Sequence, residues 1–99
     1  MKEQIEKFRA SLEKMLAQHN AERFKHLPPP RIEISMGKRF ARIIKTGDGS
    51  TSAYGFIDLV NGDLLKAAGW KGPAMHARGN IFAENMLDGC GPYGMKYLK

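Results

Sequence analysis

A chain of 99 residues, of which 42% are apolar and 26% charged, has the length and composition of one globular domain and excludes a multidomain protein. Sixteen Lys and Arg against ten Asp and Glu give a formal charge of +6, which favours a polyanionic partner, although a basic protein without such a partner has the same composition. One cysteine excludes an intrachain disulfide, and no stretch has the roughly 20 apolar residues of a membrane span, so the sequence predicts a cytoplasmic protein without membrane contact.

Residues 1–26 are predicted to form an amphipathic helix. Its apolar residues recur at spacings of three, four and three and draw one narrow stripe: Ile5, Phe8, Leu12 and Met15. The stripe ends after about two heptads, which rarely hold a coiled coil alone. Two interpretations follow. Either the helix packs on the domain's own sheet, or the stripe contacts a partner protein or a second copy in a homodimer.

The prolines of "LPPP" at 27–30 end the helix and form a linker, after which residues 31–99 are predicted to form a small antiparallel-sheet domain. Alternating apolar residues predict strands at 31–35, 39–46, 53–60 and 63–68, with a polar loop at 47–52. Asn61 and Gly62 between apolar runs are typical of a two-residue type I′ turn, which would pair Val60 with Asp63 and Ile57 with Lys66.

The alternating pattern ends after residue 68. Pro73 is typical of the first residue of a short helix, "PAMHARGNIF", which Gly79 would shorten, and Ile81 and Phe82 are expected to pack inward. The segment 88–94 is expected to be irregular. The predicted fold is therefore α+β: an N-terminal helix, a three- to four-stranded antiparallel meander and an irregular C-terminal tail with a short helix.

No pattern of catalytic or metal-binding residues is present. The candidate metal ligands lack the close spacing of a zinc site, so neither a metal nor a cofactor is predicted; they are His19, His26, His76 and Cys90. An enzyme is not the expected class, and its best site would be His76 with Asp58 or Cys90.

One segment, "GWKGPAMHARGNIF" at 69–82, combines aromatic and basic side chains with three glycines and no acid between its cations. Tryptophan stacks on bases, arginine offers a planar fork for phosphate, and lysine neutralises it. The candidate nucleic-acid contacts here are Trp70, Lys71, His76 and Arg78, with Lys66 nearby. The structural alternative is a core tryptophan and an Arg78 bridged to Asp58 or Glu84.

A second basic group lies on and beside the predicted strands: Arg31, Lys38, Arg39 and Arg42. Alternation places Arg42 on a face with Phe40, and Arg39 on the other face with Ala41 and Ile43. One side of the sheet is thus expected to be both basic and aromatic, as in sheet-type proteins that bind single strands.

The C-terminal two-thirds of the chain resembles a group of small proteins common in tailed bacteriophages, above all in the segments "FIDLVNGDLLKAAGWKGPAMHARGNIF" (56–82) and "GPYGMKYLK" (91–99). The resemblance covers roughly 60 residues and implies a phage accessory protein acting in the host cytoplasm. It implies no activity and no catalytic residues. The helix and "LPPP" lie outside the shared pattern and are expected to be an appended element.

The sequence therefore favours a small phage accessory protein that binds nucleic acid, single-stranded or without sequence preference, through a basic aromatic surface. The alternative is an inhibitor that binds a host protein, such as a defence enzyme or polymerase, through the helix stripe and the rim of residues 69–82.

Overall fold

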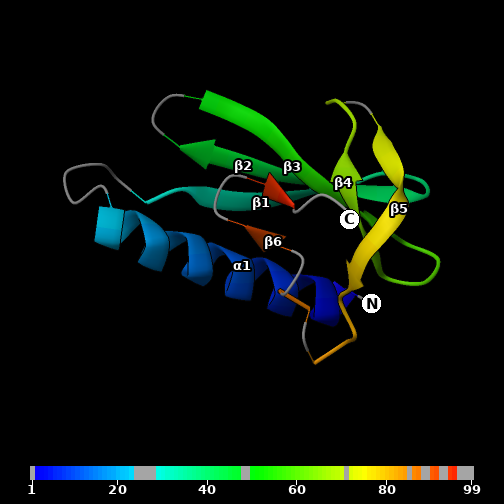
Figure 1. Ribbon diagram of the computed structural model, residues 1–99. Coiled ribbons are helices and arrows are strands. Elements are labelled where there is room, and N and C mark those ends of the chain that lie inside the picture. Colours follow the sequence, from blue (N-terminus) through cyan, green and yellow to red (C-terminus); the bar gives the residue numbers. More distant parts are fainter. Residues whose placement is uncertain are drawn as a thin grey trace.

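The computed structural model describes residues 2–23, 29–47, 50–70, 72–84, 86–87, 90–91 and 94–95, and it describes only the backbone of Arg23, Ser50, Met75, His76, Arg78 and Met95. One helix, five strands of a main sheet and a short ribbon follow each other along the chain (Figure 1): α1 (Lys2–Arg23), β1 (Arg31–Met36), β2 (Phe40–Gly47), β3 (Ser50–Asp58), β4 (Asp63–Ala67), β5 (Pro73–Asn80), β6 (Cys90–Gly91) and β7 (Gly94–Met95). The expected α+β fold is confirmed.

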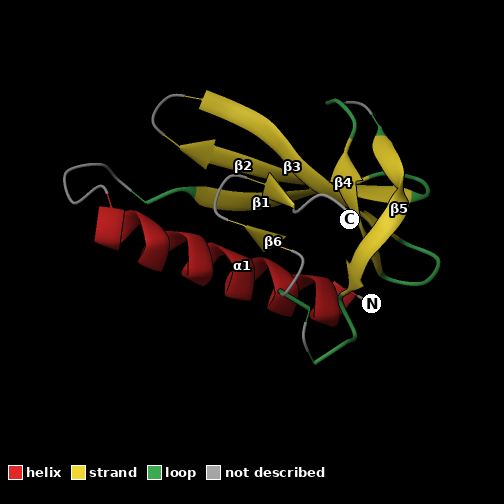
Figure 2. Ribbon diagram, in the orientation of Figure 1, coloured by secondary structure: helices red, strands yellow, loops and turns green. Residues whose placement is uncertain are grey.

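The main sheet is a meander in which every strand pairs antiparallel with the next, in the order β1-β2-β3-β4-β5. It therefore has five strands rather than three or four. The helix α1 lies along one face of this sheet, and the β6–β7 ribbon packs beside it against β3 and β4 (Figure 2). Among the described residues, no helix lies on the opposite face.

The apolar stripe of α1 fills the space between helix and sheet. Ile5, Phe8 and Leu12 are at most 5% exposed and share one core with the strands, as does Leu16 one turn further on, while Met15 packs at its border. The protein's own sheet thus occupies the stripe, as the first of the two interpretations predicts. A partner would reach Ile5, Phe8 and Leu12 only if the fold opened.

The β3–β4 connection differs from the predicted two-residue turn. Ile57 pairs with Leu64 and Gly55 with Lys66, so the register is shifted by two residues and four residues form the turn. The main chain of Asp58 accepts a hydrogen bond from the Gly62 N–H at 2.7 Å, and Gly62 has a φ of 84°. A shift of two residues keeps every side chain on its predicted face, because the strand repeats every two residues.

The predicted short helix at 73–82 is wrong, because Pro73–Asn80 is strand β5. Pro73 lacks the N–H that a central strand needs, but β5 is the edge of the sheet and Pro73 is its first residue, where proline is tolerated. Pairing with β4 outweighs the local helix signal. Ile81 is buried as expected after this strand, whereas Phe82 is 56% exposed.

The helix also protects the other edge of the sheet. The N–H of Ile32 in β1 donates a hydrogen bond to Glu13 Oε2 at 2.9 Å, and Arg9 Nη1 donates to the Ile32 carbonyl at 3.3 Å. Arg9 is also paired with Glu6, and this hydrogen bond lowers the pKa of the Glu6 carboxyl. Side chains of α1 thus satisfy both outward-facing backbone groups of Ile32 at the β1 edge.

Candidate nucleic-acid interface

The face of the sheet opposite α1 carries a second, smaller cluster. Phe56 and Leu65 are 3% and 5% exposed, yet both lie outside the core that α1 covers. Arg42 is opposite Phe56 in the β2–β3 pair, and Phe56 is opposite Leu65 in the β3–β4 pair. Because directly opposed residues share a face, these three side chains form one row across three strands.

Trp70 reaches this row from the loop between β4 and β5. Arg42 Nε donates a hydrogen bond to the Trp70 carbonyl at 2.8 Å, and its guanidinium lies 4.7 Å from the centre of the Trp70 ring. The same guanidinium lies 6.0 Å from the centre of the Phe56 ring. Trp70 remains 45% exposed, which excludes the alternative of a core tryptophan. The contacts of Arg42 therefore hold an exposed indole over the sheet.

Arg39 lies one residue before β2, at the end of the β1–β2 turn. Its guanidinium is 5.2 Å from the centre of the Phe40 ring, and one of its nitrogens is 3.6 Å from Asp58 Oδ2. The expectation that Arg39 shares a face with Ala41 and Ile43 is wrong, because both of these are fully buried in the core. Arg39 lies outside the strand, so the alternation of β2 does not fix its direction.

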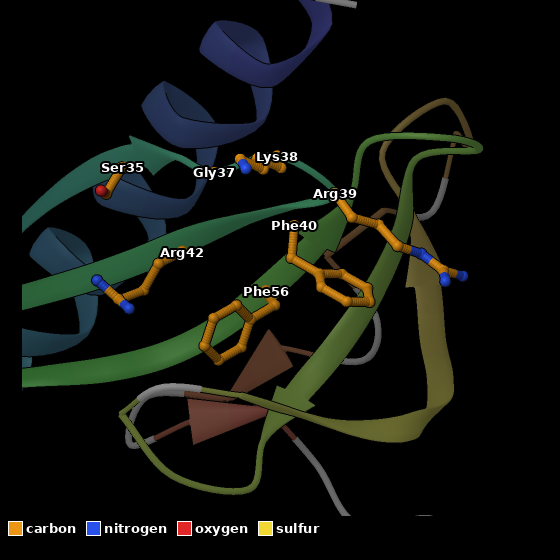
Figure 3. Close-up of a pocket in the computed structure, with 7 residues that line it drawn as sticks. All are labelled: Ser35, Gly37, Lys38, Arg39, Phe40, Arg42 and Phe56. Carbon is orange, nitrogen blue, oxygen red and sulfur yellow. The ribbon is translucent and has the colours of Figure 1, made fainter.

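An open hollow of about 240 Å³ lies between the β1–β2 turn and this row (Figure 3). None of the described residues that line it is acidic; they are Ser35, Gly37, Lys38, Arg39, Phe40, Arg42 and Phe56. In the part of the chain that the structure describes, no carboxylate forms an ion pair with Arg42. The Phe40 and Phe56 rings lie side by side, with Arg39 and Arg42 at opposite ends of the pair. The hollow is thus positive with an aromatic floor.

The structure brings together only some of the residues that the sequence singled out. Trp70, Arg42 and Arg39 lie at this surface, and the predicted shared face of Arg42 and Phe40 is confirmed. Lys66 alternates with Leu65 in β4 and so lies on the opposite face, where it cannot join Trp70. Lys71 lies outside the described residues. The backbones of His76 and Arg78 belong to β5, but their side chains also lie outside the described part.

Three residues of the surface were not on the list of candidate contacts: Lys38, Phe40 and Phe56. The signal for Phe40 and Phe56 was present in the sequence, since both alternate with buried strand residues and Phe40 shares a face with Arg42. Lys38 belongs to the second basic group, but it lies in a turn, where alternation does not fix the direction of its side chain.

The first 92 residues match one protein-family model. The chain belongs to the family of unknown function DUF7717. No curated protein and no solved structure matches it. The DUF7717 match includes the N-terminal helix and the proline linker, so the expectation that these are an appended element is wrong. This agrees with a core that the helix and the sheet build together.

Asn80, in the segment 69–82 of this DUF7717 chain, has a structural role. Asn80 Nδ2 donates to the Asn61 carbonyl at 2.9 Å and to Asp63 Oδ1 at 3.0 Å, and Asn80 Oδ1 accepts from the Phe82 N–H at 2.8 Å. Asn80 therefore ties the turn that follows β5 to the turn that precedes β4. This role needs no ligand.

The two alternative partners of His76, Asp58 and Cys90, lie in different parts of the fold. Asp58 accepts a hydrogen bond from the Val60 N–H at 2.9 Å and shares its strand face with Phe56, whereas Cys90 is buried in the core on the α1 side. Among the described residues of this DUF7717 protein, no three His, Cys, Asp or Glu are grouped to hold a metal, and no helix is long and apolar enough to cross a membrane.

Proposed function

We propose that this protein binds nucleic acid, without sequence preference, on the face of the sheet opposite α1. The observation that carries the proposal is the stack of Arg42 on Trp70 and Phe56, with Trp70 45% exposed beside a hollow lined by cations. We define the binding face as Lys38, Arg39, Phe40, Arg42, Phe56 and Trp70.

Each part of the binding face suits one part of a nucleic acid. An exposed indole offers a stacking surface worth roughly 1–3 kcal/mol per base, and every base has a suitable ring face. Lys38, Arg39 and Arg42 offer positive charge for phosphates, whose contacts carry no sequence information. The formal charge of +6 adds a long-range attraction for any polyanion. The wider proposal, from the sequence resemblance, is an accessory role of a phage protein in the host cytoplasm.

The experiment is a titration of fluorescently labelled single-stranded and duplex oligonucleotides, followed by anisotropy at roughly 50 and 200 mM salt. Three phosphate contacts, by Lys38, Arg39 and Arg42, predict that single-strand affinity falls about 20-fold between these two salt concentrations. Arg42→Ala and Trp70→Ala should weaken binding. Lys14→Ala is the matched control, because Lys14 is an exposed cation of α1, on the other side of the sheet. No binding at low salt, or equal losses in all three variants, would refute the proposal.

Binding of a host protein is the second candidate function. Because the helix stripe is buried in the core, we assign the contact with this protein to the β3–β4 turn instead. Val60 in this turn is 75% exposed, and Phe82, which lies against Gly62 of the same turn, is 56% exposed. Two large apolar side chains at one end of the sheet favour a protein contact there. A Val60→Ser, Phe82→Ser variant that still binds nucleic acid but no longer captures a host protein would support this candidate.

A further inference from the structure

Resting on the proposed function, we infer that the binding face selects single strands by stacking two splayed bases. One base stacks on Trp70, and the other enters the hollow and stacks on Phe40. Lys38 and Arg39 at the rim of the hollow neutralise the phosphates beside the second base. The substrate class is then single-stranded DNA or RNA of at least two nucleotides, rather than a duplex or a bare polyanion.

The separation of the two rings carries the first step. Trp70 contacts the guanidinium of Arg42 at 4.7 Å and Phe40 that of Arg39 at 5.2 Å, so the two rings are separate stacking positions. In a duplex both faces of each base are covered by the neighbouring base pairs, about 3.4 Å away. A base can therefore stack on either ring only when it is unstacked from its neighbours, and a single strand allows this at little cost.

The size and lining of the hollow carry the second step. At about 240 Å³ it is smaller than the roughly 300–1,000 Å³ of sites for drug-sized ligands, so it suits one planar base rather than a complete nucleotide cofactor. Phe56 is buried beneath Arg42 and serves as the floor, whereas Phe40 is only partly buried. Phe40, whose ring the exposed Arg39 guanidinium contacts at 5.2 Å, is thus the ring of the hollow that can receive a base when Arg39 turns to a phosphate.

The charges carry the third step. Lys38 is exposed, and no described residue that lines the hollow is acidic. Arg39 is 3.6 Å from Asp58, but its side chain is 63% exposed, so this weak surface pair leaves it able to approach a phosphate. Positive charge at the rim and aromatic rings within are complementary to a strand whose phosphates stay in water while its bases turn inward.

The test compares four ligands by competition against a labelled single strand: the unlabelled single strand, its duplex, the same strand with abasic sites, and inorganic polyphosphate. The single strand should bind most tightly. Phe40→Leu and Trp70→Leu should each weaken it about 5- to 150-fold, the loss of one base stack. Neither should change the affinity for the abasic strand or for polyphosphate. Phe82→Leu is the matched control, because Phe82 is exposed but does not line the hollow.

Phe40→Tyr keeps the aromatic face and should bind like the unaltered protein, which separates a stacking role from a packing role even if Phe40→Leu destabilises the fold. Duplex and abasic strands that bind as tightly as the single strand would overturn the inference while leaving the proposed nucleic-acid function standing. Failure of all four ligands to bind would overturn both.

Discussion

Replacing Arg42 by alanine removes the hydrogen bond to the Trp70 carbonyl and both aromatic contacts of the guanidinium. A hydrogen bond from a charged donor contributes roughly 1.5–3 kcal/mol, and each cation–π contact roughly 0.5–1 kcal/mol at exposed sites. Because Arg42 and Trp70 are both partly exposed to water, we count only the hydrogen bond, at the low end of its range, about 1.5 kcal/mol. The loop that carries Trp70 should then leave the sheet about ten times more often.

Trp70 is the only tryptophan, so its fluorescence reports this loop directly. Arg42→Ala should shift the emission maximum to longer wavelength, increase quenching by acrylamide and lower the melting temperature by roughly 6–12 °C. Arg42→Lys should behave almost like Arg42→Ala, because lysine keeps the charge but lacks the planar group that stacks on the indole. Lys38→Ala removes the same charge from the same face without a contact to Trp70, and should leave the fluorescence unchanged.

Unchanged emission, quenching and melting temperature in both Arg42 variants would refute this reasoning, because the indole would then be held by something other than the guanidinium. The same changes in Lys38→Ala would also refute it, since they would trace the effect to net charge. Either result would remove the stack on which the proposed function rests.

Three further predictions concern stability. Gly62→Ala should lower the free energy of unfolding, measured in urea, by at least about 2 kcal/mol, because φ is 84° and a Cβ would lie 2.7 Å from the Phe82 ring. Unchanged stability would contradict this. Adding Phe82→Ala to the same chain should recover only the part of the loss that comes from the clash with the ring. Glu13→Ala should cost about 1 kcal/mol and promote aggregation measured by light scattering, because the Ile32 N–H at the sheet edge loses its acceptor; an equally stable, non-aggregating variant would contradict it. Burial lowers the pKa of Lys45 in the folded protein, so the unfolded chain holds that proton more tightly. The free energy of unfolding should therefore rise with pH between the folded pKa of Lys45 and its unfolded pKa of about 10.4. Lys45→Met should reduce this rise in denaturant titrations at neutral and alkaline pH, and an unchanged slope would contradict the assignment.

The elements with a repeating apolar pattern could be predicted from the sequence. The helix stripe and the first four strands follow directly from spacings of three to four and of two, which is why α1 and β1 to β4 lie within a few residues of their expected bounds. Strand β5 could not be found in this way. Pro73 and Gly79 carry a local signal against a strand, and only the free edge of β4 makes pairing more favourable.

The candidate site was predictable in part for the same reason. Alternation placed Arg42 and Phe40 on one face, and composition drew attention to Trp70. The contact between Arg42 and Trp70 joins residues 28 positions apart, and no local pattern specifies it. Lys66 was misplaced because nearness to Trp70 in the sequence says nothing of the sheet face, which the alternation of β4 decides.

The helix that closes the core is made before any strand that covers it. About 65 residues separate Leu16 from Ile81, and both belong to the same buried cluster. At the usual rate of synthesis of roughly 5–20 residues per second, the apolar stripe has no complete partner for roughly 3–13 s after it is made. During this interval the nascent chain exposes the apolar face of the helix to water. The hydrogen bond from the Gln4 side chain to the Ile81 carbonyl can form only after Ile81 has been made and has packed beside the helix.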